Sequence, residues 1–304
     1  MVYTFAVSEM RGSGLDSKLI VAELDRNPWD EGVCERLLAQ ARVESGEGEA
    51  WNYYRDELTA DELGDMVRRL RSARTLEERY RLMAEKAANG DYWLDVVQGM
   101  VYEHGGSNAA LEGFVSQRQW QSALDLGSGT GMTSTRMTGS ADKLVSADRF
   151  EFLLELARGD VPEGSEGPAR GWVAVDARGV LPFSEGAFDL VVANGLSAFI
   201  PRERFGVFAG ELFRVLKPGG VFLEPMPDSG EVMRQYKQSA KGLLVYMLGE
   251  LMTSPGPGKS GAYPHNYMDL VGQYMEAGFE AEVEKNDDGS AIAVYRKPGE
   301  DVGP

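Results

Sequence analysis

The chain has 304 residues, and its 31 lysines and arginines stand against 48 aspartates and glutamates, which gives a formal net charge of −17. Nucleic acids and anionic membrane surfaces are bound chiefly through lysine and arginine, so the charge argues against both classes of partner. The length suits roughly one or two domains of about 150 residues each. A hydrophobic content of 43% predicts a folded core rather than disorder.

Cysteine and histidine are scarce, because Cys34, His104 and His265 are the only ones in the sequence. An intramolecular disulfide is impossible, and a metal site of the zinc type is not expected. Met1–Glu9 lacks the basic and apolar parts of a signal peptide, and the apolar run Gly242–Met252 is too short to span a bilayer. We therefore expect a cytoplasmic protein without membrane insertion, whose oligomeric state the sequence leaves open.

Helical patterns dominate residues 1–106. Thr59 with Glu62, and Thr75 with Glu78, have the spacing of capping boxes, and apolar residues recur at helical intervals after each. The other elements expected here are a strand at Lys18–Leu24 and helices at Asp30–Val43 and Asp91–Tyr102.

After Gly106, short apolar runs alternate with helical segments, which predicts an α/β fold with a mostly parallel sheet. Asn286–Gly289 tolerates positive φ, so it predicts a hairpin that makes one strand antiparallel. The expected organisation is a helical region over 1–106, an α/β domain over 107–298 and a polar tail over 299–304. The seven expected strands are Ser122–Leu126, Lys143–Ala147, Gly171–Val175, Phe188–Ala193, Gly220–Glu224, Phe279–Lys285 and Ser290–Arg296.

Three glycines, Gly127, Gly129 and Gly131, alternate with other residues directly after the first of these strands. Glycines in such a pattern let the backbone approach a ligand closely. A dinucleotide fingerprint counted from Gly127 requires glycine where the chain has Met132. A nicotinamide-dependent oxidoreductase is therefore the less favoured user of this loop.

Further landmarks follow the loop in order. Asp148 ends the second strand 21 residues beyond Gly127, and Asp176 with Ala177 follows the third strand. An LPF motif and the strand FDLVVAN come next, and the run LFRVLKPGG over 212–220 leads into the fifth strand.

From Leu124 to Glu224 these landmarks resemble the class I S-adenosylmethionine-dependent methyltransferases. The resemblance is to the small-molecule branch with methyltransferase type 11 domains, which includes the ubiquinone and menaquinone C-methylases. It implies a Rossmann-like sheet and S-adenosylmethionine as cofactor, with Asp148 on the ribose hydroxyls and Asp176 on the adenine amino group. The implied cofactor-binding residues are Asp125, Gly127, Ser128, Gly129, Gly131, Asp148, Arg149, Asp176, Ala177 and Asn194.

Some of these residues also have structural interpretations. Asp125 is equally suited to hydrogen-bond the backbone of the loop, and Asp189 is better explained as a residue that supports the start of a strand. Asn194 and Gly195 lie where ligands of open α/β sheets bind, and they suit either role.

No residue stands out as catalytic. His104, His265 and Glu224 are the candidates, with Asp228 and Tyr263 as further groups that could face the pocket. A histidine such as His104 at a helix end beside glycines is better explained as a C-terminal cap that interacts with the helix dipole.

The expected activity is direct SN2 methyl transfer to a small molecule, with an O-, C- or N-nucleophile left open. Asn194–Ser197 lacks the Asn/Asp-Pro-Pro-Tyr/Phe motif of methylases that act on exocyclic or amide nitrogens, so that acceptor class is disfavoured. We expect residues 1–106 to help cover the acceptor, with Met233–Met252 as a possible lid. A catalytically idle cofactor-binding or scaffold protein is the main alternative.

Overall fold

The computed structural model describes residues 31–45, 51–53, 56–87, 90–97, 107–161, 167–224, 243–244, 247–248, 267–285 and 291–299. Two compact units make up the chain. Met1–Gly105 and Pro227–Ala262 form the N-terminal unit, whereas Gly106–Met226 and Tyr263–Pro304 form the sheet unit. The predictions at Lys18–Leu24, 98–102 and Asn286–Gly289 fall outside the described residues.

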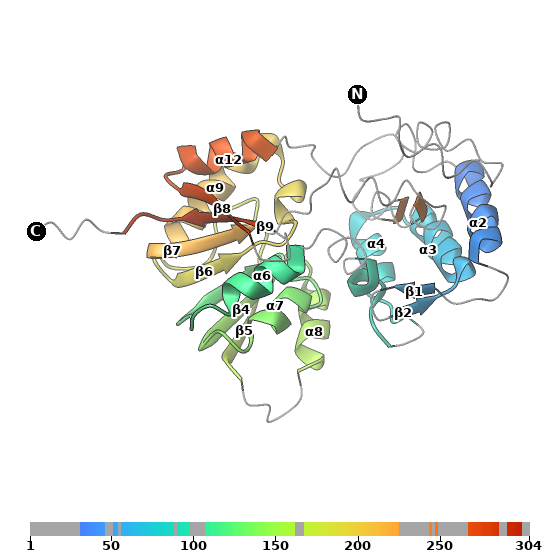
Figure 1. Cartoon of the computed structure of the whole chain (residues 1–304), viewed down its shortest axis with the longest axis horizontal. Coiled ribbons are helices and arrows are strands. Elements are labelled where there is room, and N and C mark those ends of the chain that lie inside the picture. The colour runs from blue at the N-terminus through green and yellow to red at the C-terminus, as the bar shows by residue number, and fades with distance from the viewer. Residues whose placement is uncertain are drawn as a thin grey trace, which may run out of the picture. The chain divides into compact units, whose positions relative to one another are not determined.

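Most of the described residues of the N-terminal unit are helical (Figure 1). Residues 93–97, within the predicted helix Asp91–Tyr102, are helical as well. Two short strands, which the sequence did not predict, pair antiparallel between the first two helices. The named elements of the N-terminal unit are α2 (Glu31–Ser45), β1 (Trp51–Tyr53), β2 (Asp56–Leu58), α3 (Ala60–Ser72) and α4 (Leu76–Met83).

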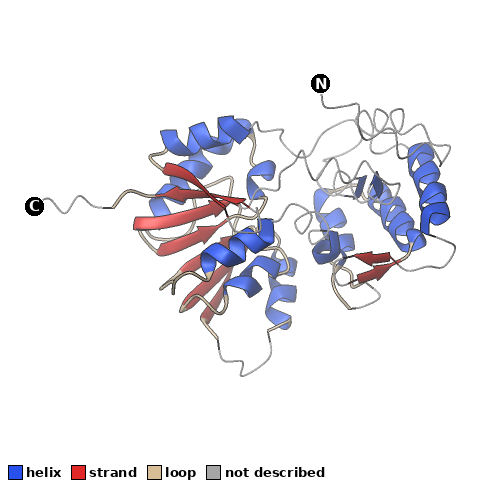
Figure 2. Ribbon diagram, in the orientation of Figure 1, coloured by secondary structure: helices blue, strands red, loops and turns tan. Residues whose placement is uncertain are grey.

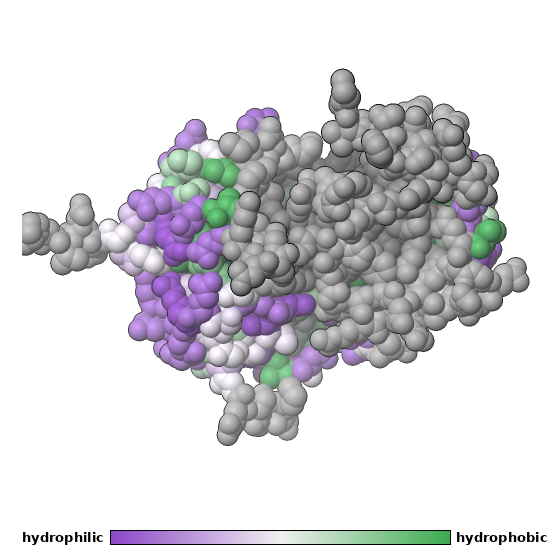
Figure 3. Space-filling model, viewed as in Figure 1, coloured by the Kyte–Doolittle hydropathy of each residue, from purple (hydrophilic) through white to green (hydrophobic). Residues whose placement is uncertain are grey.

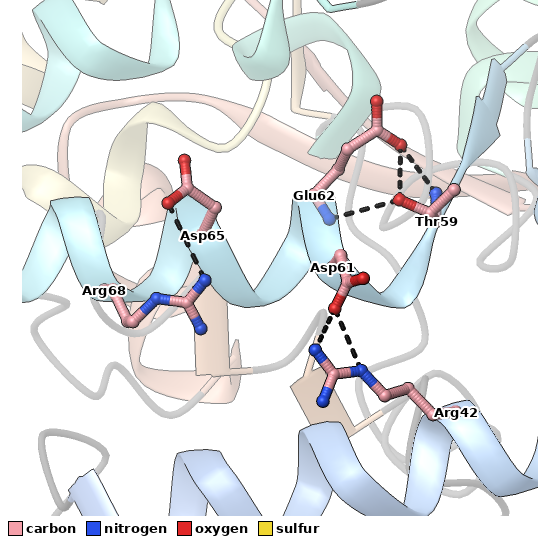
Figure 4. Close-up of polar contacts among 6 residues, drawn as sticks. All are labelled: Arg42, Thr59, Asp61, Glu62, Asp65 and Arg68. Atoms are coloured by element: carbon pink, nitrogen blue, oxygen red, sulfur yellow. Dashed lines mark hydrogen bonds and ion pairs between the residues drawn. The ribbon is translucent and has the colours of Figure 1, made fainter. Parts of the chain in front are cut away.

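Both predicted capping boxes are confirmed. At the start of α3, the Thr59 backbone N–H donates to Glu62 Oε2 at 2.7 Å, and the Glu62 N–H donates back to Thr59 Oγ1 at 3.2 Å (Figure 4). Thr75 and Glu78 repeat the arrangement at α4. Each box satisfies backbone donors that the first turn of a helix leaves without partners. In the same close-up, Arg42 of α2 donates through Nε to Asp61 of α3 at 2.9 Å.

The sheet unit contains the predicted seven-stranded sheet, in the order β5-β4-β3-β6-β7-β9-β8. Five neighbouring strands are parallel, and β9 pairs antiparallel with both β7 and β8, as the predicted hairpin requires. The strands are β3 (Ala123–Leu126), β4 (Lys143–Asp148), β5 (Ala169–Ala174), β6 (Phe188–Val192), β7 (Leu216–Glu224), β8 (Glu280–Lys285) and β9 (Ala291–Arg296).

Helices cover both faces of the sheet (Figure 2). Side chains alternate between the two faces, so Val191 of β6 packs with α9 and α12, whereas Leu190 packs with α6. Burial on both faces explains why the central strands β3, β6 and the end of β7 are apolar runs. The helices are α6 (Ser107–Val115), α7 (Met132–Met137), α8 (Glu151–Gly159), α9 (Phe205–Val215) and α12 (Tyr267–Glu276), with 3₁₀ turns η2 (Leu196–Phe199) and η3 (Arg202–Arg204).

On the face shown in Figure 3, the described residues that are visible are mostly hydrophilic. Large exposed hydrophobic side chains in these residues are scattered over separate elements, for example Val207 on α9, Met275 on α12 and Val283 on β8. In the part of the chain that the structure describes, no helix combines the length and the apolar character needed to cross a bilayer.

Candidate functional site

The glycine loop leaves β3 at the carboxyl edge of the parallel strands and leads into α7. Gly127 and Gly131 have φ of +77° and +93°, a conformation that side chains other than hydrogen rarely permit. Gly127 N and Ser128 N donate to the Ala147 carbonyl oxygen at 2.7 and 3.0 Å. These bonds tie the loop to the end of β4.

The η2 turn after β6 lies against the glycine loop. A Cβ atom added to Gly127 would lie 3.0 Å from Leu196 Cδ1, and Leu196 begins the η2 turn after β6. Glycine at 127 therefore permits a close contact between the turn and the loop. At the other end of the loop, a Cβ on Gly131 would lie 3.1 Å from Ala157 Cβ of α8.

Asp125 lies beneath the loop and is fully buried. Ser134 Oγ of α7 donates to Asp125 Oδ2 at 2.6 Å and lies 2.7 Å from Ser146 Oγ of β4. Burial raises the pKa of Asp125 to about 7, and the nearby Asp148 carboxylate adds to the increase. Oδ1 has no hydrogen-bond partner in the structure. Asp125 is thus joined to α7 and β4, and one oxygen is left for a donor.

Asp148 ends β4 and is built into the loop through backbone donors. Gly129 N donates to its Oδ2 and Phe150 N to its Oδ1, both at 2.9 Å. Burial raises the pKa of Asp148, although these N–H groups and Arg149 act in the opposite direction. Each carboxylate oxygen can accept a second hydrogen bond, so the side chain retains capacity for a diol.

Asp176, after β5, is in a different environment. Its side chain is 43% exposed, and Arg178 Nε donates to Oδ1 at 2.8 Å while Arg178 Nη2 contacts Oδ2. The Arg149 guanidinium lies 3.9 Å from Oδ2. Hydrogen bonds from Arg178 hold the pKa of Asp176 below its ordinary value. Ala177, the next residue, is buried.

Asn194 follows β6 at the same edge. Its Nδ2 donates to Thr133 Oγ1 of α7 at 3.1 Å, whereas Oδ1 is buried without a hydrogen-bond partner. Ser128 Oγ in the glycine loop is also buried and without a partner. Asp125 Oδ1 is the third such oxygen, so three buried oxygens without partners belong to residues at the ends of β3 and β6. Parallel α/β sheets bind ligands at this kind of edge, where the strand order reverses.

Glu224, the last residue of β7, is a buried acid at the end of the neighbouring strand. Tyr274 Oη of α12 donates to Glu224 Oε2 at 3.0 Å. Burial raises the pKa of Glu224 to about 7, although Ser197 and Tyr274 lower it in part.

The remaining sequence candidates divide into two groups. Asp189 has the structural role expected of it, since its carboxylate accepts the Gln121 and Ser122 backbone N–H groups at 2.8 Å. The other candidates, His104, Asp228, Tyr263 and His265, lie outside the described residues. Within the described residues, no group of three His, Cys, Asp or Glu side chains is placed to hold a metal ion.

Sequence reasoning missed several partners of these acids. Ser134, Leu196, Ser197 and Tyr274 carry no motif of their own. Ser146 is the exception, because it occupies the position of β4 in register with Asp125 of β3. The parallel register of β3 and β4 is thus the signal that could have predicted the proximity of Ser146 and Asp125.

Comparisons with known proteins agree with this geometry. A family of proteins described as "Methyltransferase domain" matches residues 124–223. The chain is 34% identical over 103 residues to a demethylmenaquinone methyltransferase of Leptospira interrogans. The matched segment covers 33% of this chain and 40% of that protein. The chain is 31% identical over 97 residues to the biotin biosynthesis bifunctional protein BioHC of Cellvibrio japonicus, which covers 32% and 18%.

The match therefore spans less than half the length of each of these relatives. A solved structure described as a putative S-adenosyl-L-methionine-dependent methyltransferase of Methanococcus maripaludis has a TM-score of 0.49 and 16% identity, covering 69% of this chain and 93% of that one. The family match runs from β3 to β7 and includes the glycine loop, Asp148 and Asp176. Residues 124–223 are thus similar to a methyltransferase domain, in agreement with the resemblance to the class I S-adenosylmethionine-dependent methyltransferases.

Proposed function

We propose that the protein transfers a methyl group from S-adenosylmethionine to a small-molecule acceptor. The glycine loop carries the proposal, because it lies at the carboxyl edge of β3, bonded to Ala147 and Asp148, inside the segment that matches the methyltransferase family. When bound, S-adenosylmethionine supplies an electrophilic methyl group, which the acceptor's nucleophile takes by SN2 displacement.

The unsatisfied oxygens at this edge fit such a ligand. Asp125 Oδ1, Ser128 Oγ and Asn194 Oδ1 are buried and lack partners, so they favour a ligand that brings hydrogen-bond donors. A cofactor with an ammonium group and a sulfonium charge meets that requirement. Asp148 has capacity for the ribose hydroxyls, and the remaining lone pairs of Asp176 suit the adenine amino group.

Alignment is the main task of the protein in such a reaction, because the reacting carbon and nucleophile must be held in line. We assign the cofactor to the sheet unit and selection of the acceptor in part to residues 1–106. The family match, over residues 124–223, supports the assignment of the cofactor, and the role of residues 1–106 stays a prediction. The acceptor atom and a cytoplasmic location stay predictions.

The test is calorimetric titration of the full-length protein with S-adenosylhomocysteine. We expect the wild type to bind it and Gly127→Ala to bind about tenfold or more weakly, because alanine is strained at positive φ and its Cβ would meet Leu196. Gly139→Ala is the matched control, since a Cβ there has nothing within 4 Å. The control is expected to bind like the wild type.

The outcomes separate the rival functions. Failure of the wild type to bind S-adenosylhomocysteine would overturn the proposal, and binding of NAD or NADP in its place would favour an oxidoreductase. Binding without methyl transfer from labelled cofactor to any of a broad panel of small acceptors would favour an idle cofactor-binding protein.

A further inference from the structure

Three buried polar side chains form a connected group beneath the glycine loop. Asp125 of β3, Ser134 of α7 and Ser146 of β4 are each at most 2% exposed. Ser134 Oγ donates to Asp125 Oδ2 at 2.6 Å and lies 2.7 Å from Ser146 Oγ. Polar groups at this depth are costly to bury, and apolar side chains would fill the same space without that cost. The two hydroxyls therefore call for an explanation beyond packing.

The hydrogen bonds of this group run in one direction. A serine hydroxyl carries a single hydrogen, and Ser134 donates its own to Asp125. The contact between the two serines is then a hydrogen bond in which the Ser146 hydroxyl donates to Ser134 Oγ. We call the series from Ser146 through Ser134 to Asp125 the hydroxyl relay. Hydrogen bonds in such a series polarise and strengthen one another.

The hydroxyl relay joins the two ends of the glycine loop. Asp125 lies in β3 just before the loop, and Ser134 lies in the first turn of α7 just after it. Ser146, in register with Asp125, extends the connection to β4. The end of β4 also holds the loop, because the Ala147 carbonyl and the Asp148 carboxylate accept its N–H groups. The relay therefore fixes the Asp125 carboxyl group relative to the loop itself.

The other oxygen of Asp125 is left for a ligand. Oδ1 is buried and has no hydrogen-bond partner in the structure. Because a carboxylate is planar, holding Oδ2 also determines where Oδ1 presents its lone pairs. Ser128 Oγ and Asn194 Oδ1, at the same edge of the sheet, are likewise buried without partners. These oxygens suit a positively charged group with several N–H donors, and the ammonium group at the amino-acid end of S-adenosylmethionine is such a group.

We propose, on the basis of the proposed function, that Ser134 and Ser146 are positioning residues that orient Asp125 toward the amino-acid end of the cofactor. Neither serine contacts the cofactor, and each acts through the carboxyl group that the hydroxyl relay holds. The relay therefore contributes to affinity for the amino-acid end. Affinity for the nucleoside end is left to Asp148 and Asp176.

The experiment compares two ligands by calorimetry on the full-length protein. S-adenosylhomocysteine has both ends of the cofactor, whereas 5′-methylthioadenosine has the nucleoside without the amino acid. We expect Ser134→Ala to weaken binding of S-adenosylhomocysteine about tenfold, because Asp125 loses the donor that orients it. Binding of 5′-methylthioadenosine should change by less than about twofold.

Thr138→Ala is the matched control for this variant. Its hydroxyl, at the end of α7, donates to the Thr135 carbonyl oxygen at 2.7 Å and takes no part in the hydroxyl relay. The control removes a hydroxyl from the same helix, and we expect it to bind both ligands like the wild type.

Ser146→Ala tests the direction of the relay. It should weaken binding of S-adenosylhomocysteine by about threefold, less than Ser134→Ala does, because Ser134 keeps its own bond to Asp125. In the Ser134→Ala background the same change should have no further effect, since Ser146 acts only through Ser134. Additive effects of the two changes would overturn the relay. Ser146→Ala also carries the comparison of the two ligands if Ser134→Ala does not fold.

The remaining outcomes separate the relay from the proposed function. Equal weakening of both ligands in Ser134→Ala would mean that the serine supports the loop in general, and the inference would be overturned. Wild-type affinity for S-adenosylhomocysteine in Ser134→Ala would also overturn it and leave the proposed function intact. If the wild type itself fails to bind S-adenosylhomocysteine, the proposed function fails, and the inference fails with it.

Discussion

The acids at the ends of β4 and β5 lie on neighbouring strands, and the structure holds them by different means. Asp148, in register with Ala174 of β5, is 9% exposed and accepts two backbone N–H groups. Asp176 is half-exposed and is held mainly by the side chain of Arg178, with one further hydrogen bond from the Arg178 backbone N–H at 3.1 Å. The family resemblance gives the two acids comparable tasks on the nucleoside part of the cofactor.

Asp148 therefore helps to fix the backbone of the glycine loop, whereas Asp176 leaves the backbone of that loop unaffected. Removing Asp148 disturbs the backbone of the glycine loop, because Gly129 N loses its acceptor. The main partner of Asp176 is an arginine side chain, which can rearrange at little cost, and the backbone N–H that it also accepts is exposed and can bond to water instead. We therefore expect substitutions at Asp148 to affect stability and affinity together, and substitutions at Asp176 to affect affinity much more than stability.

The largest effect is expected for Asp148→Ala. The Gly129 and Phe150 N–H groups lose their acceptor, at roughly 1–3 kcal/mol each where they stay buried, and the ribose loses the partner proposed for it. S-adenosylhomocysteine affinity should fall about 100-fold or more. Calorimetry and urea unfolding measure the two effects. Asp160→Asn, an exposed acid after α8, is the control, and wild-type affinity in Asp148→Ala would rule out the ribose role.

Asp176→Ala should have a smaller effect, seen mainly in the affinity for S-adenosylhomocysteine and hardly in stability. We expect S-adenosylhomocysteine affinity to fall about tenfold, because the charge-assisted hydrogen bond proposed between Asp176 and the adenine amino group is lost. The midpoint of urea unfolding should stay close to that of the wild type, since the side chain is half-exposed. A loss of stability as large as that of Asp148→Ala would remove the distinction between the two acids.

The pH dependence of stability should have opposite signs at the two acids. The folded-state pKa of Asp148 is raised, so its contribution is present below the ordinary value of 3.8 and is lost as pH rises through the folded value. The pKa of Asp176 is lowered, so its contribution is present above 3.8 and is lost as pH falls through the folded value.

Unfolding free energies measured at several pH values from 3 to 8 test these signs. Relative to the wild type, Asp148→Asn should gain stability as pH rises, whatever its constant offset. Asp176→Asn should lose a little stability relative to the wild type as pH rises through the acidic part of the range. Parallel curves for both variants would show that neither acid titrates as the structure indicates.

The smallest effect is expected for Arg178→Ala. Asp176 then loses a competing donor but keeps Arg149 nearby, so cofactor affinity should change by less than about threefold. Calorimetry under the same conditions measures it. A loss as large as that of Asp176→Ala would mean that Arg178, and not only the acid, contacts the cofactor.

The sequence by itself determined the features that depend on a few neighbouring residues. The capping boxes of α3 and α4, the seven strands, the hairpin pairing of β8 with β9 and the glycine loop all follow from local spacing. Backbone hydrogen bonds, side-chain periodicity and the conformational freedom of glycine act over short stretches of chain, so their signatures can be read directly.

Only the tertiary structure decided which groups meet. Strand register places Ser146 beside Asp125, and helix packing places Tyr274 against Glu224, 50 residues earlier in the chain. Leu196 reaches Gly127 because β3 and β6 are neighbours in the sheet. Such pairs depend on strand order and on the face to which a side chain points. These properties belong to the packed sheet, so the acids could be named from the sequence while their partners and pKa shifts could not.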